Sequence, residues 1–194
     1  MIRRLCVFCG SNSGIRPVYR DAARSLGALL VRQKMGLVYG GGRVGLMGAL
    51  ADAVLDAGGE AIGVIPRALV EKEIGHRGLT ELRIVPSMHE RKAEMMKLAD
   101  AFIALPGGYG TLEEFCEVVT WLQLGLHRKP CGLLNIDGYY DPLLALFRHA
   151  QSEGFLHPVH ASIVLADSDP DRLLESLRNF AVPHLDKWLN PKQA

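Results

Sequence analysis

The sequence lacks most of the features that mark membrane, secreted and nucleic-acid-binding proteins. No apolar run approaches the ~20 residues that a membrane span requires. The apolar run that follows Arg3 and Arg4 is too short for a secretory signal. The formal net charge of the 194 residues is only +1, which gives no basic field for a nucleic acid. We therefore expect a cytoplasmic protein with neither a membrane nor a nucleic acid as partner.

The cysteines and histidines also lack the spacing of a metal site. Cys6 and Cys9 form a C-x-x-C within a predicted strand, where residues three apart point to opposite faces. No second ligand pair accompanies them. The seven histidines are scattered along the chain, and His157 and His160 flank a proline without further ligands. We expect buried structural thiols, no metal and no cofactor.

Glycine is the residue that the sequence has in excess, with 21 residues gathered in clusters. Between the clusters, short β-type runs alternate with helical runs, and several of the β-type runs are almost wholly apolar, which is typical of strands covered on both faces. This pattern predicts an α/β fold with a doubly wound, mostly parallel sheet and helices on both faces. The predicted strands are 4–9, 36–41, 60–65, 81–86, 101–106, 131–136 and 162–166, and the predicted helices are 17–33, 45–57, 88–99, 111–126, 140–153 and 170–180.

We expect one domain over residues 1–182, followed by a C-terminal tail over 183–194. Residues 66–81 are the most loop-like part of the middle. In open α/β sheets, ligands bind outside the carboxyl ends of the strands. Most of the first five predicted strands end in glycine, serine or charged residues, so we expect the site at this edge.

The stretch PGGYGTLEE (106–114) is the first candidate. Gly107, Gly108 and Gly110 permit close approach of the backbone, and Thr111 with Glu114 fits a helix N-cap and capping box. Such a helix start is an anion site, but a structural turn into a capped helix explains the same residues equally well. Glu113 and Glu114 both suit a helix start, so spacing alone does not select a catalytic one.

Two further turns flank this candidate. CGSNSG (9–14) offers short donors suited to a phosphate or a base, although a plain turn accounts for it nearly as well. YGGGRVGLMG (39–48) lacks the Gly-Lys-Ser/Thr ending of a P-loop. It brings backbone near the predicted site, or serves tight packing between a strand and a helix.

The predicted helix 88–99 carries an arginine on its apolar stripe. Arg91 falls between Met88 and Met95 on the face that also carries Leu98. An arginine that faces inward needs a carboxylate or a phosphate, although it could also extend to the surface. Lys92, its neighbour, is expected nearer to solvent.

These motifs occur together in one order, with GVIP, MHERKAEM and WLQLGLHRKPCGLLNIDGYYDPLL among them. In this combination the sequence, from about residue 4 to residue 180, resembles the LOG ("Lonely Guy") family of cytokinin riboside 5′-monophosphate phosphoribohydrolases. The resemblance implies a Rossmann-like fold and a homodimer with sites near the dimer interface. It also implies hydrolysis of the N-glycosidic bond of an adenine-type nucleoside 5′-monophosphate, which releases the free base and ribose 5-phosphate.

The resemblance makes Arg91 and Glu114 the catalytic residues. Glu71 competes with Glu73 for a substrate contact before the helix. The substrate contacts expected from the motifs and the resemblance together are Ser11, Gly41, Glu73, Lys92, Gly107, Gly108, Tyr109, Gly110, Thr111, Leu112, Glu113 and Thr120.

In the expected mechanism, Glu114 stabilises the positive charge that develops on the ribose and activates water. Its place in the first helical turn would keep it ionised, and Arg91 supports it. Two alternatives stay open: a general purine monophosphate nucleosidase in salvage, and a non-enzymatic carrier of a phosphorylated pterin, the molybdenum cofactor. Family members have been labelled lysine decarboxylases, but the sequence shows no pyridoxal-phosphate lysine site.

Overall fold

The computed structural model describes residues 1–70 and 75–183 of the chain. Its strands form one sheet in the order β4-β3-β2-β1-β5-β6-β7, and each neighbouring pair is parallel. The predicted doubly wound sheet is confirmed, and the sheet is parallel throughout rather than mostly. The strands are β1 (Arg4–Phe8), β2 (Gly36–Tyr39), β3 (Ala61–Pro66), β4 (Glu81–Val85), β5 (Ala101–Ala104), β6 (Cys131–Leu134) and β7 (Val164–Asp167).

The six predicted helices are present, with ends that differ by up to three residues. They are α1 (Pro17–Arg32), α2 (Gly45–Asp56), α4 (Met88–Leu98), α5 (Tyr109–Gln123), α6 (Asp141–Ser152) and α8 (Pro170–Arg178). Three short helices among the described residues were not predicted: α3 (Arg67–Val70), the 3-10 turn η1 (Ile136–Gly138) and α7 (Pro158–Ala161). The first of these lies in the stretch predicted as a loop. Single helical turns carry too few residues to show a helical period.

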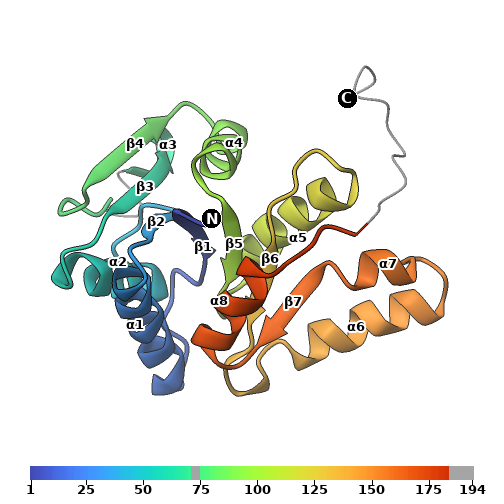
Figure 1. The fold of residues 1–194 in the computed structure, drawn as a ribbon. Coiled ribbons are helices and arrows are strands. Elements are labelled where there is room, and N and C mark those ends of the chain that lie inside the picture. The colour runs from blue at the N-terminus through green and yellow to red at the C-terminus, as the bar shows by residue number, and fades with distance from the viewer. Residues whose placement is uncertain (71–74, 184–194) are drawn as a thin grey trace.

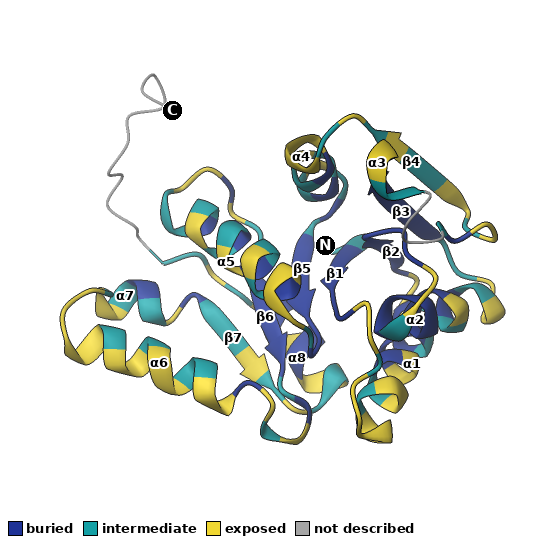
Figure 2. Cartoon of the chain, turned by 180° about the vertical axis from the view of Figure 1, so that it is seen from behind, coloured by how far each residue is buried: buried dark blue, intermediate teal, exposed yellow. Residues whose placement is uncertain are grey.

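Helices cover both faces of the sheet (Figure 1). Helices α1, α2 and α8 pack on one face, and α4 and α5 pack on the other. Side chains of β1 alternate between the two cores, so Cys6 and Cys9 lie on opposite faces as buried, unpaired thiols. Figure 2 shows that the inner strands are buried, whereas the edge strands β4 and β7 are more exposed.

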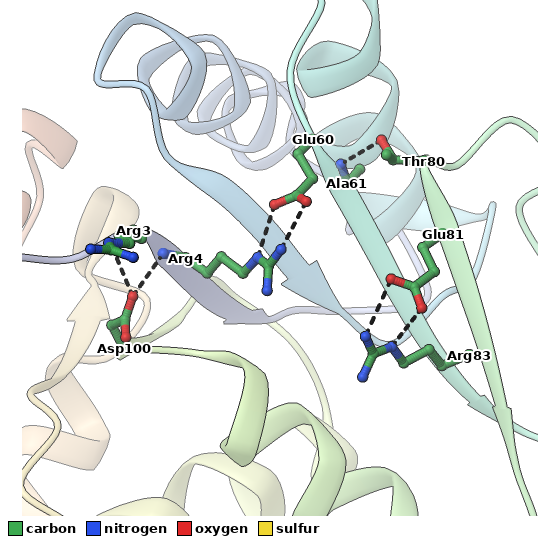
Figure 3. Close-up of polar contacts among 8 residues, drawn as sticks. All are labelled: Arg3, Arg4, Glu60, Ala61, Thr80, Glu81, Arg83 and Asp100. Atoms are coloured by element: carbon green, nitrogen blue, oxygen red, sulfur yellow. Dashed lines mark hydrogen bonds and ion pairs between the residues drawn. The ribbon is translucent and has the colours of Figure 1, made fainter.

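Polar pairs occupy the edge of the sheet where the strands begin (Figure 3). Asp100 accepts hydrogen bonds from the backbone amides of Arg3 and Arg4 at 2.8 and 3.0 Å. The Arg4 guanidinium donates two bonds of 2.9 Å to Glu60, and this contact lowers the pKa of that carboxyl group. Because these charges are paired with one another and partly exposed, they contribute only about 0–1 kcal/mol each to stability.

The chain reverses its winding direction between β1 and β5, because β2, β3 and β4 follow on one side of β1 and β5, β6 and β7 on the other. Crevices at such switch points, outside the carboxyl ends of the strands, are the binding sites of open α/β sheets. Among the described residues, no helix is both long and apolar enough to cross a membrane. Glu71 and Glu73 lie outside the described residues, as does the predicted tail beyond Pro183.

Candidate active site

A pocket of about 420 Å³ opens at the switch point between β1 and β5. Its volume lies within the range of small-molecule sites. The turns that follow these two strands form its floor, and Arg91, Glu114, Tyr19 and Tyr139 complete its walls. The predicted location of the site, at the carboxyl edge, therefore coincides with a real cavity.

The turn after β5 presents a row of backbone amides. Across residues 107–111, the structure shows no hydrogen bond from a backbone amide to any acceptor in the described parts of the chain. The first helical bond of α5 runs from the amide of Leu112 to the carbonyl of Gly108 at 3.1 Å. The preceding amides are thus the unpaired donors of a helix start, where the helix dipole also favours an anion.

The glycines of this turn serve different purposes. A Cβ on Gly107 would lie 2.1 Å from Oγ1 of Thr111. The Thr111 side chain can therefore occupy its position only because residue 107 has no side chain. A Cβ on Gly108 or Gly110 would meet no protein atom within 4 Å. Packing therefore does not require glycine at these two positions, and the space beside them is open for a ligand.

The capping role predicted for Thr111 is wrong. Helix α5 begins at Tyr109 with Gly108 as N-cap, and no side chain caps it. Thr111 is the third helical residue, and its buried side chain lines the pocket instead. The helix begins two residues earlier because the carbonyl of Gly108 already accepts a helical bond.

The start of α2 is closed by protein. The amide of Leu46 donates to the carbonyl of Gly10 at 3.0 Å, and a Cβ on Gly45 would lie 2.3 Å from the backbone of Ser11. The glycine-rich stretch 39–48 thus serves close packing at the start of α2, and its residue Gly40 also lines the pocket, so both of its interpretations apply. Gly41 packs near Leu82 and Ile65 and does not line the pocket.

Arg91 faces inward as its position on the helix predicted, and it is only 8% exposed. Its Nη1 lies 3.0 Å from Oε1 of Glu114, and its Nε donates to the carbonyl of Val64 at 3.1 Å. Met88, expected on the same apolar stripe, is 42% exposed, yet its sulfur lies 3.3 Å from Nη1. Because the ion pair is nearly buried, removal of one partner would leave the other charge uncompensated and would destabilise the protein.

Glu114 was expected in the first turn of α5, but it lies beyond that turn. With Gly108 as N-cap, Glu114 is the sixth helical residue, and the first turn holds no acidic side chain. The helix dipole falls off within the first turn. The adjacent guanidinium of Arg91, rather than the dipole, therefore provides the positive charge beside this carboxylate.

Lys92 does not line the pocket. Its Nζ contacts Glu113 at 2.5 Å and Glu117 at 2.9 Å, both on α5. Burial is the largest single influence on the pKa of Lys92 and lowers it, but the two carboxylates together outweigh it, so the net pKa is raised. Lys92 follows Arg91 by one residue, about 100° around the helix, and so it faces a different direction.

The structure brings together eight of the predicted contacts and leaves the others aside. Those that line the pocket are Ser11, Arg91, Gly107, Gly108, Tyr109, Gly110, Thr111 and Glu114. Those described but not on its wall are Gly41, Lys92, Leu112, Glu113 and Thr120.

Tyr19 and Tyr139 also line the pocket and were not predicted as site residues. Tyr139 follows β6, in the stretch NIDGYYD at the carboxyl end of that strand. Its two tyrosines beside a glycine were the available signal. Tyr19 lies in the first turn of α1, and its ring meets that of Tyr139 edge-on at 5.7 Å.

The chemical groups on the pocket wall include a carboxylate, a guanidinium and one thiol. Cys9 lines it, but burial, followed by the charge of Glu114, raises the pKa of this thiol far above its ordinary value. Within residues 1–70 and 75–183, no three His, Cys, Asp or Glu side chains gather as metal ligands would. The arrangement thus combines a bank of amides with a carboxylate and a guanidinium.

The chain is similar to known proteins over most of its length. A family described as "Possible lysine decarboxylase" matches residues 47–177. The chain is 56% identical over 178 residues to a probable cytokinin riboside 5′-monophosphate phosphoribohydrolase of Oryza sativa subsp. japonica, covering 92% of this chain and 78% of that protein. It is 51% identical over 185 residues to a cytokinin riboside 5′-monophosphate phosphoribohydrolase of Arabidopsis thaliana, covering 95% of this chain and 85% of that protein.

Solved structures share the fold at lower identity. The molybdenum cofactor binding protein of Rippkaea orientalis matches with a TM-score of 0.68 and 22% identity, over 92% of this chain and 96% of that one. The molybdenum cofactor carrier protein of Chlamydomonas reinhardtii matches with a TM-score of 0.65 and 16% identity, over 92% and 97%. At this identity the likeness concerns the fold alone, and it agrees with the Rossmann-like architecture.

Proposed function

The chain belongs to the LOG family of cytokinin riboside 5′-monophosphate phosphoribohydrolases, and from this premise we propose that it hydrolyses the N-glycosidic bond of adenine-type nucleoside 5′-monophosphates. The products are the free base and ribose 5-phosphate. The substrates we propose are N6-modified cytokinin nucleotides and AMP. The observation that carries the proposal is the nearly buried Arg91–Glu114 ion pair on the wall of a pocket whose floor is an open bank of amides.

The 5′-phosphate would bind at the start of α5. The amides of residues 107–111 supply donors without protein acceptors among the described residues, and the open space beside Gly108 and Gly110 leaves room for phosphate oxygens. Binding of this unreactive group fixes the ribose relative to the rest of the pocket. Such binding energy from a remote group positions the bond that reacts.

The chemical step would take place beside Glu114. Breaking the bond between C1′ and the base develops positive charge on the ribose, as in glycoside hydrolysis. The Glu114 carboxylate stabilises this charge, orients the water that adds to C1′ and accepts the proton that this water loses. The base leaves with the electron pair of the broken bond and takes up a proton from solvent. Arg91 holds the carboxylate in place through the 3.0 Å contact.

Two other activities fit the pocket less well. Decarboxylation through a Schiff base requires a lysine at the reacting centre, and the described residues that line the pocket include none. A carrier of an anionic pterin would gain nothing from a carboxylate beside its ligand. General purine salvage would use the same phosphate and ribose contacts, so it differs from cytokinin release only in the base.

The test is product formation from two substrates. The purified protein is incubated with AMP and with N6-isopentenyladenosine monophosphate, and free base is measured by chromatography. Glu114→Gln keeps the size of the side chain but removes its charge, so we expect turnover to fall by on the order of 10²–10³-fold or more, with nucleotide binding largely retained. Binding of nucleotide without release of either base by the wild type would favour the carrier, and full activity of Glu114→Gln would remove this residue from the mechanism.

We also propose that the protein is a homodimer. Helix α6 is amphipathic yet buries none of its residues, and an apolar groove between it, α5 and α7 is lined by Phe115, Phe147 and Phe155 among others. Phe155 is 88% exposed, and together with the groove it forms an apolar surface of the kind that marks protein–protein interfaces. Thr120 also lines this groove, so its expected contact with substrate would depend on the partner subunit.

We further propose a cytoplasmic location, with which the four unpaired cysteines are consistent.

A further inference from the structure

Two neighbouring tyrosines reach from the far half of the sheet to the glycine turn after β5. The hydroxyl of Tyr139 donates to the carbonyl of Gly107 at 2.6 Å, and the hydroxyl of Tyr140 donates to the carbonyl of Leu105 at 2.6 Å. Their rings meet edge-on at 5.0 Å. One pair of side chains thus holds the turn at two points, two residues apart.

The turn between these points is held as well. The carbonyl of Pro106 accepts a hydrogen bond from the amide of Gly10 at 3.0 Å. Three successive carbonyls of the turn therefore each have a donor. All peptide bonds of the described chain are trans, so the N–H of each peptide points opposite to its carbonyl. Fixing the carbonyls of Pro106 and Gly107 fixes the direction of the amides of Gly107 and Gly108.

The two tyrosines directly follow a turn with an unusual backbone conformation. Asp137 and Gly138 are consecutive residues with positive φ, at 53° and 72°. The carboxylate of Asp137 pairs with Arg16, and the side chain of Asn135 accepts from the amide of Tyr140 at 2.7 Å. A residue other than glycine rarely adopts this conformation. The backbone here is therefore held by specific contacts at its two ends.

We propose that Tyr139 is a positioning residue for phosphate binding, through its hydrogen bond to Gly107. This inference rests on the proposed function, because it assigns the amides of the turn to a 5′-phosphate. Tyr140 is buried and supports the core, whereas Tyr139 is 38% exposed and lines the pocket. The Tyr139 hydroxyl is thus the part of the pair that can be removed with little loss of packing.

The chain offers a matched control. The hydroxyl of Tyr39 is buried and has no hydrogen-bond partner in the described parts of the chain, and Tyr39 does not line the pocket. Tyr139→Phe and Tyr39→Phe therefore make the same chemical change, but only the first removes a hydrogen bond. Loss of one neutral hydrogen bond corresponds to a change in affinity of about 5- to 10-fold.

The experiment measures binding of ribose 5-phosphate by calorimetry and the kinetics of AMP hydrolysis for the wild type and both variants. We expect Tyr139→Phe to raise Kd for ribose 5-phosphate and KM for AMP by about 5- to 10-fold, with kcat changed less. Tyr39→Phe should match the wild type in both. This split between KM and kcat separates positioning from a general loss of structure, which would affect both quantities.

The other outcomes distinguish the positioning role of Tyr139 from the proposed hydrolase activity. Unchanged binding by Tyr139→Phe, or an equal loss in Tyr39→Phe, would overturn the positioning role and leave the proposed function intact. A wild type that does not bind ribose 5-phosphate would also overturn it. A wild type that binds ribose 5-phosphate in a Tyr139-dependent way but releases no base would support the positioning role and contradict the hydrolase.

Discussion

The guanidinium of Arg91 lies in the space that a side chain at Gly40 would fill. A Cβ built on Gly40 would be 2.1 Å from Nη2 of Arg91 and 3.3 Å from its Cζ. The strand end of β2 thus admits the arginine only because residue 40 has no side chain. This arrangement places the guanidinium between the sheet and Glu114.

Gly40→Ala should therefore reduce catalysis more than stability. The atom in the way is the end of a flexible side chain, so Arg91 can move aside without disturbing the backbone, but it then leaves its position at Glu114. We expect kcat for AMP to fall by on the order of 10- to 100-fold, the effect of a small misplacement at a reacting centre. Gly78→Ala, at an exposed loop position, is the matched control for thermal unfolding and activity. Equal activity of the two variants would show that the position of Arg91 is not set by Gly40.

Gly107 and Gly110 should respond to alanine in opposite ways. At Gly107 a methyl group would meet Thr111 and, at 2.8 Å, the amide nitrogen of Gly10, so Gly107→Ala should destabilise the fold by about 1–3 kcal/mol. At Gly110, inside α5, it would meet no protein atom. Alanine there should stabilise the helix by up to about 1 kcal/mol.

The same Gly110→Ala variant should lose affinity for nucleotide, because the methyl group would fill space that we assign to the phosphate. Thermal unfolding and AMP binding, measured together, check this prediction. A variant that is more stable and binds as well as the wild type would place the phosphate elsewhere.

The sheet was predictable because its strands are apolar runs separated by regular helical patterns. The glycine turn and Arg91 could be located as well, since one follows a predicted strand and the other interrupts an apolar stripe. The directions in which side chains point were harder to predict from the sequence. The family resemblance implied that Lys92 contacts the substrate, but in the structure one step along the helix from Arg91 turns its side chain towards Glu113 and Glu117.

The helix start at Gly108 and the contribution of Tyr139 could not be predicted from the sequence. Threonine is a common N-cap, so the hydroxyl of Thr111 suggested a boundary that the backbone of Gly108 sets instead. The bond from Tyr139 to Gly107 joins residues 32 positions apart. Only the order of the strands, with β6 beside β5, brings them together.

The stability of the protein should decrease as the pH falls below about 6.5, in part through His127. Its ring is buried, Nε2 donates to the carbonyl of Val118 at 2.8 Å, and Nδ1 accepts from the amide of Lys129 at 3.1 Å. Burial lowers the pKa of His127 from its ordinary value of 6.5. The unfolded chain therefore binds a proton at a higher pH than the folded chain does.

It follows that the contribution of His127 to stability is complete above pH 6.5 and is lost as the pH falls towards the lowered pKa of the folded state. Urea unfolding between pH 5 and pH 7.5 measures this loss. His127→Gln should be less stable at pH 7 but should show a weaker pH dependence, whereas a variant of the exposed His89, His89→Gln, should keep the wild-type dependence. The same slope in all three proteins would contradict the assignment.

Phe155 should control assembly if the groove between α5, α6 and α7 is the dimer interface. A charge at this exposed position would be desolvated on association, and burying an unpaired charge is strongly unfavourable. We expect Phe155→Asp to elute as a monomer in size-exclusion chromatography with light scattering. The monomer should remain folded, which its thermal unfolding checks. Ile84→Asp places the same charge on the edge strand β4, at the opposite end of the sheet, and should remain dimeric.

A monomeric wild type, or equal dissociation in both variants, would contradict an interface at this groove. If Phe155→Asp is a folded monomer, its AMP hydrolysis then shows whether one subunit suffices for catalysis.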